Sequence, residues 1–251
     1  CANDKERMDM ATSLHRAEIL VRRGMPLYRN DMYTLLQKCS QSKDMGICRD
    51  AHKLLAFCGF SSLSALMDPC IRMFTSCGSL LEASLAFSKV SEPSSYTWHA
   101  IISAHLKLGL LNHAFDLYYN MQSEGMLCNH IISLAMVKGC TDQNALNEGQ
   151  ILHCHIVSCN FDADLALGSA LIDMYGKCGS LVDSEIIFNR LSSRDVVVWN
   201  AMIAAYASHG HGMEALSLYY QMQGHDVKCE KVSSLNALGA CSGLAILACG
   251  M

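Results

Sequence analysis

The fold is decided by residues Ser169 to Gln223, which read SALIDMYGKCGSLVDSEIIFNRLSSRDVVVWNAMIAAYASHGHGMEALSLYYQMQ. Apolar residues recur here at spacings of three and four, which predicts four short amphipathic helices. A less similar copy of this stretch lies N-terminal to it. Cys77 in that copy corresponds to Cys178, 101 residues later, and Trp98 corresponds to Trp199 at the same offset. A period held over this much text indicates an array of repeats, each burying its apolar face against its neighbours.

Units of two lengths alternate through the chain. Segments of 35, 31 and 35 residues make up one period of 101. Each segment holds two helical stretches, and glycines such as Gly109 and Gly210 fall where a first helix should end. The sequence therefore predicts an all-α, right-handed solenoid of stacked helix-turn-helix units, with no linker and no second domain.

The unit boundaries follow from this division. We expect units at 29–63, 64–94, 95–129, 130–164, 165–195 and 196–230, between a degenerate unit end at 1–28 and a truncated unit at 231–251. Only the second helix of the degenerate unit is recognisable, because His15 to Gly24 shares the phase of Asp116 to Gly125. We expect the chain to be an excerpt of a longer protein, because it starts at a cysteine and stops within a unit.

Two helix starts are predicted by a shared pattern. Ser79 with Glu82, and Ser180 with Asp183, have the spacing of a capping box. In that motif the hydroxyl accepts from a free backbone N–H and the acid caps back.

The composition is apolar and slightly acidic. Hydrophobic residues make up 51%, charged residues 17%, and the formal net charge is −4. Such a composition suits helices buried between neighbouring repeats, whereas a typical nucleic-acid binder is basic. No apolar run reaches the roughly 18 residues that span a bilayer, so we expect no membrane partner.

Many of the 14 cysteines follow the same period. The pairs Cys39 and Cys140, Cys58 and Cys159, and Cys77 and Cys178 are each 101 residues apart. No Cys-x-x-Cys spacing occurs, so a zinc site is not predicted. We expect reduced, buried cysteines that act as small apolar side chains, which is typical of a reducing compartment.

Histidines suggest no metal or catalytic site. Alternate residues on a helix point about 200° apart, so His153 and His155 cannot easily share one metal ion. His209 and His211 flank the helix-closing Gly210, where they would cap carbonyl groups or face solvent. No catalytic constellation is visible, so we expect neither an enzyme, nor a cofactor, nor a small-molecule substrate.

Three strings resemble the plant pentatricopeptide repeat proteins, in particular the subclass that alternates P, L and S motifs. They are Met174 to Gly179 in an S motif, Trp199 to Ile203 in a P motif, and Gly149-Gln150 with His153 in an L motif. The resemblance implies binding of single-stranded RNA in mitochondria or chloroplasts, at about one nucleotide per repeat. It also implies a role in transcript processing or cytidine-to-uridine editing.

In the family that this chain resembles, the fifth and last residues of a motif read one base together. Carried over, the S motifs offer Asp68 with Ser94 and Ser169 with Asp195, and the P motifs offer His99 with Asn129 and Asn200 with Glu230. The resemblance associates a hydroxyl with an aspartate, as in Ser169 and Asp195, with guanine, and Asn200 with pyrimidines. An alternative is that Ser169 and Asp195 are a helix cap and a turn residue, and that Asn200 is a polar residue that fills a helix start.

The L motifs differ from the others at the fifth residue, and the sequence has no deaminase motif. Their fifth residues are Tyr33, Leu134 and Leu235, and leucine cannot hydrogen-bond a base edge, so these motifs would act as spacers or give apolar contacts. An editing deaminase needs His-x-Glu and Pro-Cys-x-x-Cys strings, which this sequence lacks. Editing would therefore need a deaminase domain beyond Met251 or on a partner.

The rival hypothesis is a protein-binding solenoid of the tetratricopeptide type. Those repeats keep about 34 residues throughout, whereas the lengths here alternate. The net charge of −4 favours the rival, since phosphate neutralisation needs Lys and Arg.

Overall fold

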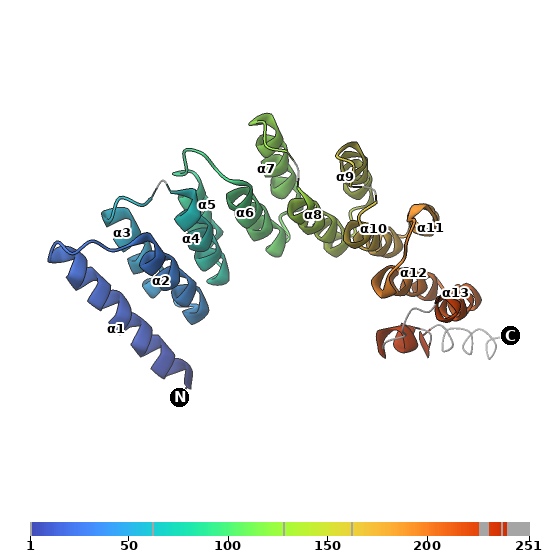
Figure 1. Ribbon diagram of the computed structural model, residues 1–251, viewed down its shortest axis with the longest axis horizontal. Coiled ribbons are helices and arrows are strands. Elements are labelled where there is room, and N and C mark those ends of the chain that lie inside the picture. Colours follow the sequence, from blue (N-terminus) through green and yellow to red (C-terminus); the bar gives the residue numbers. More distant parts are fainter. Residues whose placement is uncertain are drawn as a thin grey trace. The chain divides into compact units, whose positions relative to one another are not determined.

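The computed structural model describes residues 2–61, 63–127, 129–161, 163–225, 231–236 and 238–239, and these residues form helices joined by turns, with no strand among them. The predicted all-α fold is confirmed (Figure 1). Contacts between residues divide the chain into two compact parts, 1–127 and 128–251.

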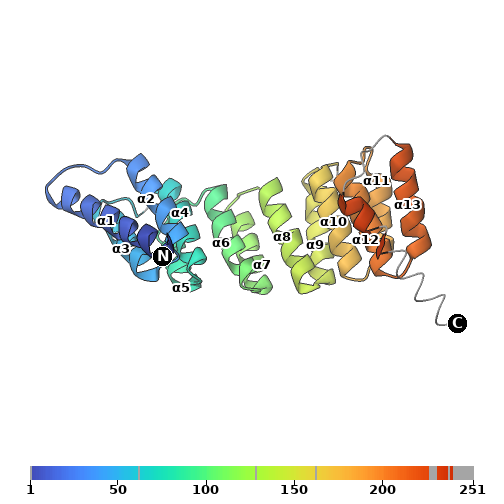
Figure 2. The ribbon, with the colours of Figure 1, turned by 90° about the horizontal axis from the view of Figure 1, so that it is seen from below.

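The first part consists of paired helices. They are α1 (Ala2–Arg22), α2 (Arg29–Ser42), α3 (Met45–Phe57), α4 (Ser64–Ser76), α5 (Leu80–Phe87), α6 (Ser95–Lys107) and α7 (Leu111–Ser123). The first helices of successive pairs lie side by side, with α2 against α4 and α4 against α6 (Figure 2). Each also packs against its own second helix, so α4 is covered by neighbours in both directions.

The second part repeats this arrangement. Its helices are α8 (His130–Gln143), α9 (Leu146–Ser158), α10 (Leu165–Lys177), α11 (Leu181–Arg190), α12 (Val196–Ser208) and α13 (Gly212–Gly224). Here α8 packs on α10, and α10 packs on α12. The second helices α5 and α11 have 8 and 10 residues, against 13 for α7 and α9, which explains the shorter 31-residue segments.

A tryptophan at the same place in both parts anchors the packing between repeats. Trp98 on α6 meets Phe87 edge-on at 4.8 Å between ring centroids, and Trp199 on α12 meets Phe188 at 5.1 Å. Both tryptophans are buried. Edge-to-face pairs at this separation stabilise by about 0.5–1.5 kcal/mol beyond the area they bury.

Glycines close the first helices as predicted. Gly109 and Gly210 follow α6 and α12 with φ of 72° and 78°. This left-handed backbone conformation costs glycine nothing, because it has no Cβ. The chain can therefore turn sharply into the second helix of each pair.

The predicted capping boxes at Ser79 and Ser180 are wrong. Neither serine accepts a hydrogen bond from its helix N-terminus. The Ser79 hydroxyl instead donates to the Glu82 carboxylate, and the Ser180 hydroxyl donates to Asp183 Oδ2 at 2.6 Å. An ionised carboxylate is a stronger hydrogen-bond acceptor than the backbone groups that the helix offers to the serine hydroxyl. The serine and the acid therefore bond each other. A capping box forms at Ser94 with Thr97.

Helix α1 is longer than the repeat period predicts. The phase of α7 places its start near residue 10, whereas α1 begins at Ala2. No glycine or proline interrupts residues 2–22, so nothing in the sequence stops the helix from extending upstream. Within the described ranges, every helix is too short or too polar to span a lipid bilayer.

The cysteines are less buried than predicted. Cys39, Cys48, Cys70 and Cys140 are buried, but Cys154 is exposed and Cys58, Cys77, Cys159 and Cys178 are partly exposed. The last four are C-cap residues, which lie at helix ends near the surface. Every cysteine in the described ranges is a free thiol, and Cys128, Cys229 and Cys241 lie outside those ranges.

Candidate nucleic-acid interface

The predicted fifth residues all lie on first helices. Asp68 is on α4 and His99 on α6 in the first part, and Ser169 is on α10 and Asn200 on α12 in the second. Asp68, His99 and Asn200 are half-buried, and Ser169 is 9% exposed. Because first helices pack on first helices within each part, these residues occupy equivalent places on neighbouring helices.

Three of the four predicted last residues, Ser94, Asn129 and Asp195, are N-caps of the next first helix. Ser94 accepts from Thr97 N at 3.2 Å, and Asn129 Oδ1 accepts from Ile132 N at 2.9 Å. Asp195 Oδ1 accepts from the backbone N–H groups of the second and third residues of α12, at 3.0 and 2.9 Å. All three residues therefore cap helices, and base reading by them stays a prediction. Both Asp195 hydrogen bonds end on Oδ1, so the cap uses one of the two carboxylate oxygens.

Asp68 and Ser94 line one pocket of about 640 Å³ in the first part. Its wall also includes Tyr33 and Gln37 of α2, Arg72 of α4 and Tyr96 of α6. Three successive repeats thus contribute side chains to one site. Its volume leaves room for a nucleotide, and its side chains combine aromatic rings, a cation and hydrogen-bonding groups.

The surroundings of the Asp68 carboxyl act on its pKa in opposite directions. Burial raises its pKa, while a hydrogen bond with Thr97 and the nearby Arg72 charge oppose that rise. Asp68 Oδ1 is buried and has no hydrogen-bond partner among the described residues. Buried polar atoms in folded proteins are nearly always paired, so this oxygen is suited to accept from a ligand.

The surroundings of His99 favour its neutral form. Burial lowers its pKa, and the positive charges of Arg72 and Lys107 lower it further. Its Nε2 lies 3.1 Å from Ser103 Oγ on the next turn of α6. The predicted partner Asn129 lies in the other part of the chain.

Ser169 and Asn200 differ in how their polar atoms are satisfied. The Ser169 hydroxyl donates to the Ala166 carbonyl at 3.0 Å, which leaves its oxygen lone pairs as acceptors. Asn200 Oδ1 is buried without a partner in the described part of the chain. Its backbone carbonyl accepts from Asn236 Nδ2 at 3.3 Å. Glu230, predicted to pair with Asn200, lies outside the described residues.

Sequence reasoning missed Arg72 and expected the motif of Tyr33 to act as a spacer or to give apolar contacts. Arg72 follows Asp68 by four residues, so both share one face of α4; that spacing was the available signal. Tyr33 is 43% exposed and lines the pocket from the preceding repeat. Leu134 is half-buried on α8, and Leu235 is 65% exposed.

The histidine pairs engage neighbours within the fold. His153 Nδ1 lies 3.0 Å from the Tyr175 hydroxyl, and His209 Nδ1 lies 2.8 Å from the Ala205 carbonyl at the end of α12. In the described residues, no group of three or more His, Cys, Asp or Glu side chains is placed to hold a metal ion.

Short helices paired in sequence and stacked first against first define a helical-repeat protein of the α-solenoid class. The particular repeat is shown by three segments, residues 96–126, 169–196 and 197–227, which match the family model described as PPR repeat. The chain contains pentatricopeptide repeats.

Curated proteins with the same repeats are similar over most of this chain. Pentatricopeptide repeat-containing protein At3g56550 of Arabidopsis thaliana is 31% identical over 217 residues, which cover 85% of this chain and 37% of that protein. The mitochondrial protein At4g31070 of the same organism is 30% identical over 237 residues, covering 93% and 37%. The chain thus spans under two fifths of the length of these relatives.

A solved structure shares the fold. The crystal structure of the pentatricopeptide repeat protein PPR10 in complex with an 18-nt psaJ RNA element aligns with a TM-score of 0.73 and 17% sequence identity. The alignment covers 92% of this chain and 35% of that chain. The predicted α-solenoid fold is therefore confirmed.

Proposed function

We propose that this chain binds single-stranded RNA, with each repeat presenting its fifth residue and the N-cap of the next first helix to one base. The main observation in support is that Asp68 and Asn200 each have a buried side-chain oxygen with no hydrogen-bond partner among the described residues. A buried acceptor left unpaired costs about 1–3 kcal/mol. A donor on a base edge would remove that cost. The fold shared with PPR10, which is solved with RNA, supports the same function.

The four predicted pairs are then distinct base readers. Asn200 Oδ1 can accept from uracil N3–H or from the cytosine amino group, which agrees with a pyrimidine preference and leaves Glu230 as the proposed second residue. Asp195 can accept from the N1–H and amino group of guanine while its Oδ1 caps α12. Ser169 adds a hydroxyl acceptor beside it. Asp68 with Ser94 is the third pair, and His99 with Asn129 stays a prediction from the sequence, because the two residues belong to different parts of the chain.

The pocket that Asp68 and Ser94 line in the first part combines several groups that a nucleotide could contact. Asp68 and Ser94 supply acceptors, Arg72 supplies a cation for a phosphate, and Tyr33 and Tyr96 supply rings on which a base can stack. Under this proposal the repeat at 29–63 contributes directly through Tyr33 and is more than a spacer.

The finer assignment rests on the alternating lengths and on the relatives. We assign the repeats to the P, L and S subclass, with the unit boundaries predicted above. Relatives whose names place them in mitochondria or chloroplasts support an organellar transcript as the target. The proposed role is to specify a site for processing or editing, with any deaminase supplied in cis or in trans.

The test is a binding assay with a randomised short RNA pool, followed by sequencing of the bound fraction. Asn200→Leu removes the unpaired oxygen at nearly constant volume, and the matched control is Asn147→Ala, at an exposed site on the second helix α9. We expect a pyrimidine position to disappear from the bound pool only in Asn200→Leu. Identical pools from both variants would count against base reading by this residue.

The rival function is protein binding, and one observation favours it. Apolar side chains on the second helices are exposed, including Leu81 at 70%, Val182 at 68% and Tyr220 at 67%. Together with the net charge of −4 they would suit a protein partner. Failure to retain any RNA at low salt would favour this function.

A further inference from the structure

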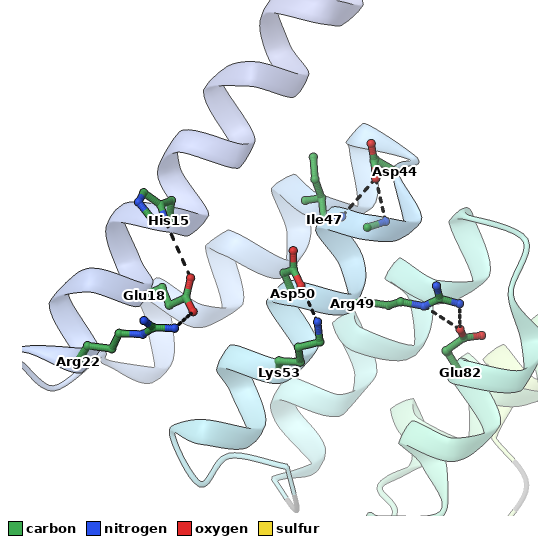
Figure 3. Close-up of polar contacts among 10 residues, drawn as sticks. His15, Glu18, Arg22, Asp44, Ile47, Arg49, Asp50, Lys53 and Glu82 are labelled. Atoms are coloured by element: carbon green, nitrogen blue, oxygen red, sulfur yellow. Dashed lines mark hydrogen bonds and ion pairs between the residues drawn. The ribbon is translucent and has the colours of Figure 1, made fainter.

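Two cysteines from neighbouring repeats meet in the first part. Cys48 on α3 and Cys77, the C-cap of α4, place their sulfur atoms 3.2 Å apart. Cys48 is fully buried, whereas Cys77 is partly exposed. Beside them, Arg49 of α3 bonds Glu82 of α5, so α3 is held against the following repeat at this point (Figure 3).

The repeat period shows that this meeting is particular to one copy. Cys77 returns as Cys178, but the position equivalent to Cys48 is Gly149. A Cβ added at Gly149 would lie 2.5 Å from Met174 Sδ, so a side chain there would have to displace the side chain of Met174. Cys178 Sγ lies 4.0 Å from the Cys140 carbonyl oxygen. The packing of the repeat therefore does not require a cysteine at residue 48.

We propose that Cys48 and Cys77 form a redox-modification site, which a peroxide converts to a disulfide that joins the repeat at 29–63 to the repeat at 64–94. This inference goes beyond RNA binding and stands on the sulfur geometry, the unequal exposure of the two thiols and the glycine in the second copy.

The chemistry proceeds in two balanced steps. The partly exposed Cys77 sulfur attacks hydrogen peroxide, the O–O bond breaks, and sulfenic acid and one water result. The Cys48 sulfur then attacks the Cys77 sulfur, the S–O bond breaks, and the departing hydroxide takes the Cys48 proton to form a second water. Two thiols and one peroxide thus give one disulfide and two waters, and two electrons pass from sulfur to oxygen.

The order of the steps follows from the surroundings of each thiol. Burial, and then the hydrogen bond with Cys77, raises the pKa of the Cys48 thiol, so it stays protonated and shielded from the oxidant. Its role is to attack the sulfenic acid of Cys77, whose sulfur lies 3.2 Å away, and so complete the disulfide. Cys39 lies close to this pair, with its carbonyl oxygen 3.8 Å from Cys48 Sγ. The experiment must therefore exclude a disulfide to Cys39.

The disulfide would fix the end of α4 against α3. Ser76, next to Cys77, already donates to the Ser40 carbonyl of α2 at 2.9 Å. Asp68 and Arg72 lie on α4, and Tyr33 and Gln37 lie on α2. Oxidation would therefore tie α4 to the repeat that contains α2, and both helices contribute side chains to the pocket. An effect on RNA binding rests on the proposed function.

The test treats the purified chain with hydrogen peroxide, blocks free thiols with N-ethylmaleimide and maps the peptides by mass spectrometry without reduction. We expect a linked pair of peptides containing Cys48 and Cys77 that lacks two hydrogen atoms and separates with dithiothreitol. Cys178 serves as the internal control, because it has the same place in its repeat and no partner thiol at position 149. It should not form the corresponding link.

The matched variant is Cys48→Gly, which copies the residue of the second repeat at this place. It should form no link, and its Cys77 should be trapped by dimedone as sulfenic acid; circular dichroism checks that it folds. The proposal is overturned if Cys77 links to Cys39 or to a second molecule, or if Cys48 remains free while Cys77 is overoxidised. The link is scored without RNA, so its absence and a failure of RNA binding are separate results.

Discussion

Arg49 and Glu82 join two repeats across 33 residues of sequence. Arg49 Nη2 lies 2.6 Å from Glu82 Oε1, and Nε lies 3.1 Å from the same oxygen (Figure 3). The second copy has Gln150 and Asp183 at the equivalent positions. Of the two copies, only the first therefore has this ion pair. It is an electrostatic link between the repeats that also supply the pocket.

Arg49→Gln should lower the thermal midpoint of the first part, because it removes the charge that faces Glu82. Arg49 is 58% exposed, so salt should screen the pair. We expect the loss at low ionic strength to shrink in high salt, as followed by circular dichroism. Lys53→Gln is the control, since its partner Asp50 lies on the same helix. Equal effects of the two changes would contradict a special role for the link between repeats.

Stability should depend on pH through Glu82. Hydrogen bonds from Ser79 and Arg49 lower its pKa from 4.5 to about 2. A lowered carboxyl pKa contributes stability above the unfolded value and loses it as pH falls through the folded value. The difference between wild type and Glu82→Gln should be constant above pH 4.5 and vanish towards pH 2. Urea titrations across this range measure it; a difference that persists at pH 2 would refute the assignment.

Asp195 should have two roles that substitutions can separate. Asp195→Ala removes the acceptor of two backbone N–H groups and should cost about 0.5–2 kcal/mol of stability. Asp195→Asn keeps the capping oxygen, so it should retain most of that stability while losing guanine preference in the bound RNA pool. Chemical denaturation and sequencing of bound RNA distinguish the roles. An asparagine variant with unchanged base preference would leave Asp195 as a cap alone.

Tyr33→Ala should weaken RNA binding by removing a stacking surface. Base stacking on an aromatic side chain stabilises by about 1–3 kcal/mol per base. Tyr220→Ala is the control, because Tyr220 is exposed on the second helix α13. Fluorescence anisotropy with a short RNA compares the two variants. Equal losses would show that the pocket is not the binding surface.

Arg72→Gln should reduce the salt dependence of RNA binding. A lysine or arginine that contacts one phosphate contributes about one unit to the slope of log affinity against log salt. Arg23→Gln, which alters an exposed arginine in the turn after α1, is the matched charge control. Titrations at several salt concentrations measure both slopes, and an unchanged slope for Arg72→Gln would exclude a phosphate contact.

The local features were predictable because they depend on neighbours a few residues away. Spacings of three and four predicted amphipathic helices, on which Trp98 and Trp199 are buried, and glycines marked the ends of helices. The capping boxes failed for a related reason: the spacing of Ser79 and Glu82 was read correctly, but the same spacing lets the two side chains bond each other. Spacing does not decide between these geometries.

By itself the sequence determined that the chain is an array of paired helices, since a period of 101 residues is visible without any contact. Only the tertiary structure decided that Tyr33, Asp68 and Ser94 line one pocket and that Cys48 meets Cys77. These residues belong to different repeats, and their approach depends on how one helix packs on the next. Period and spacing fix where a side chain lies on its own helix, whereas packing between helices fixes which side chains meet.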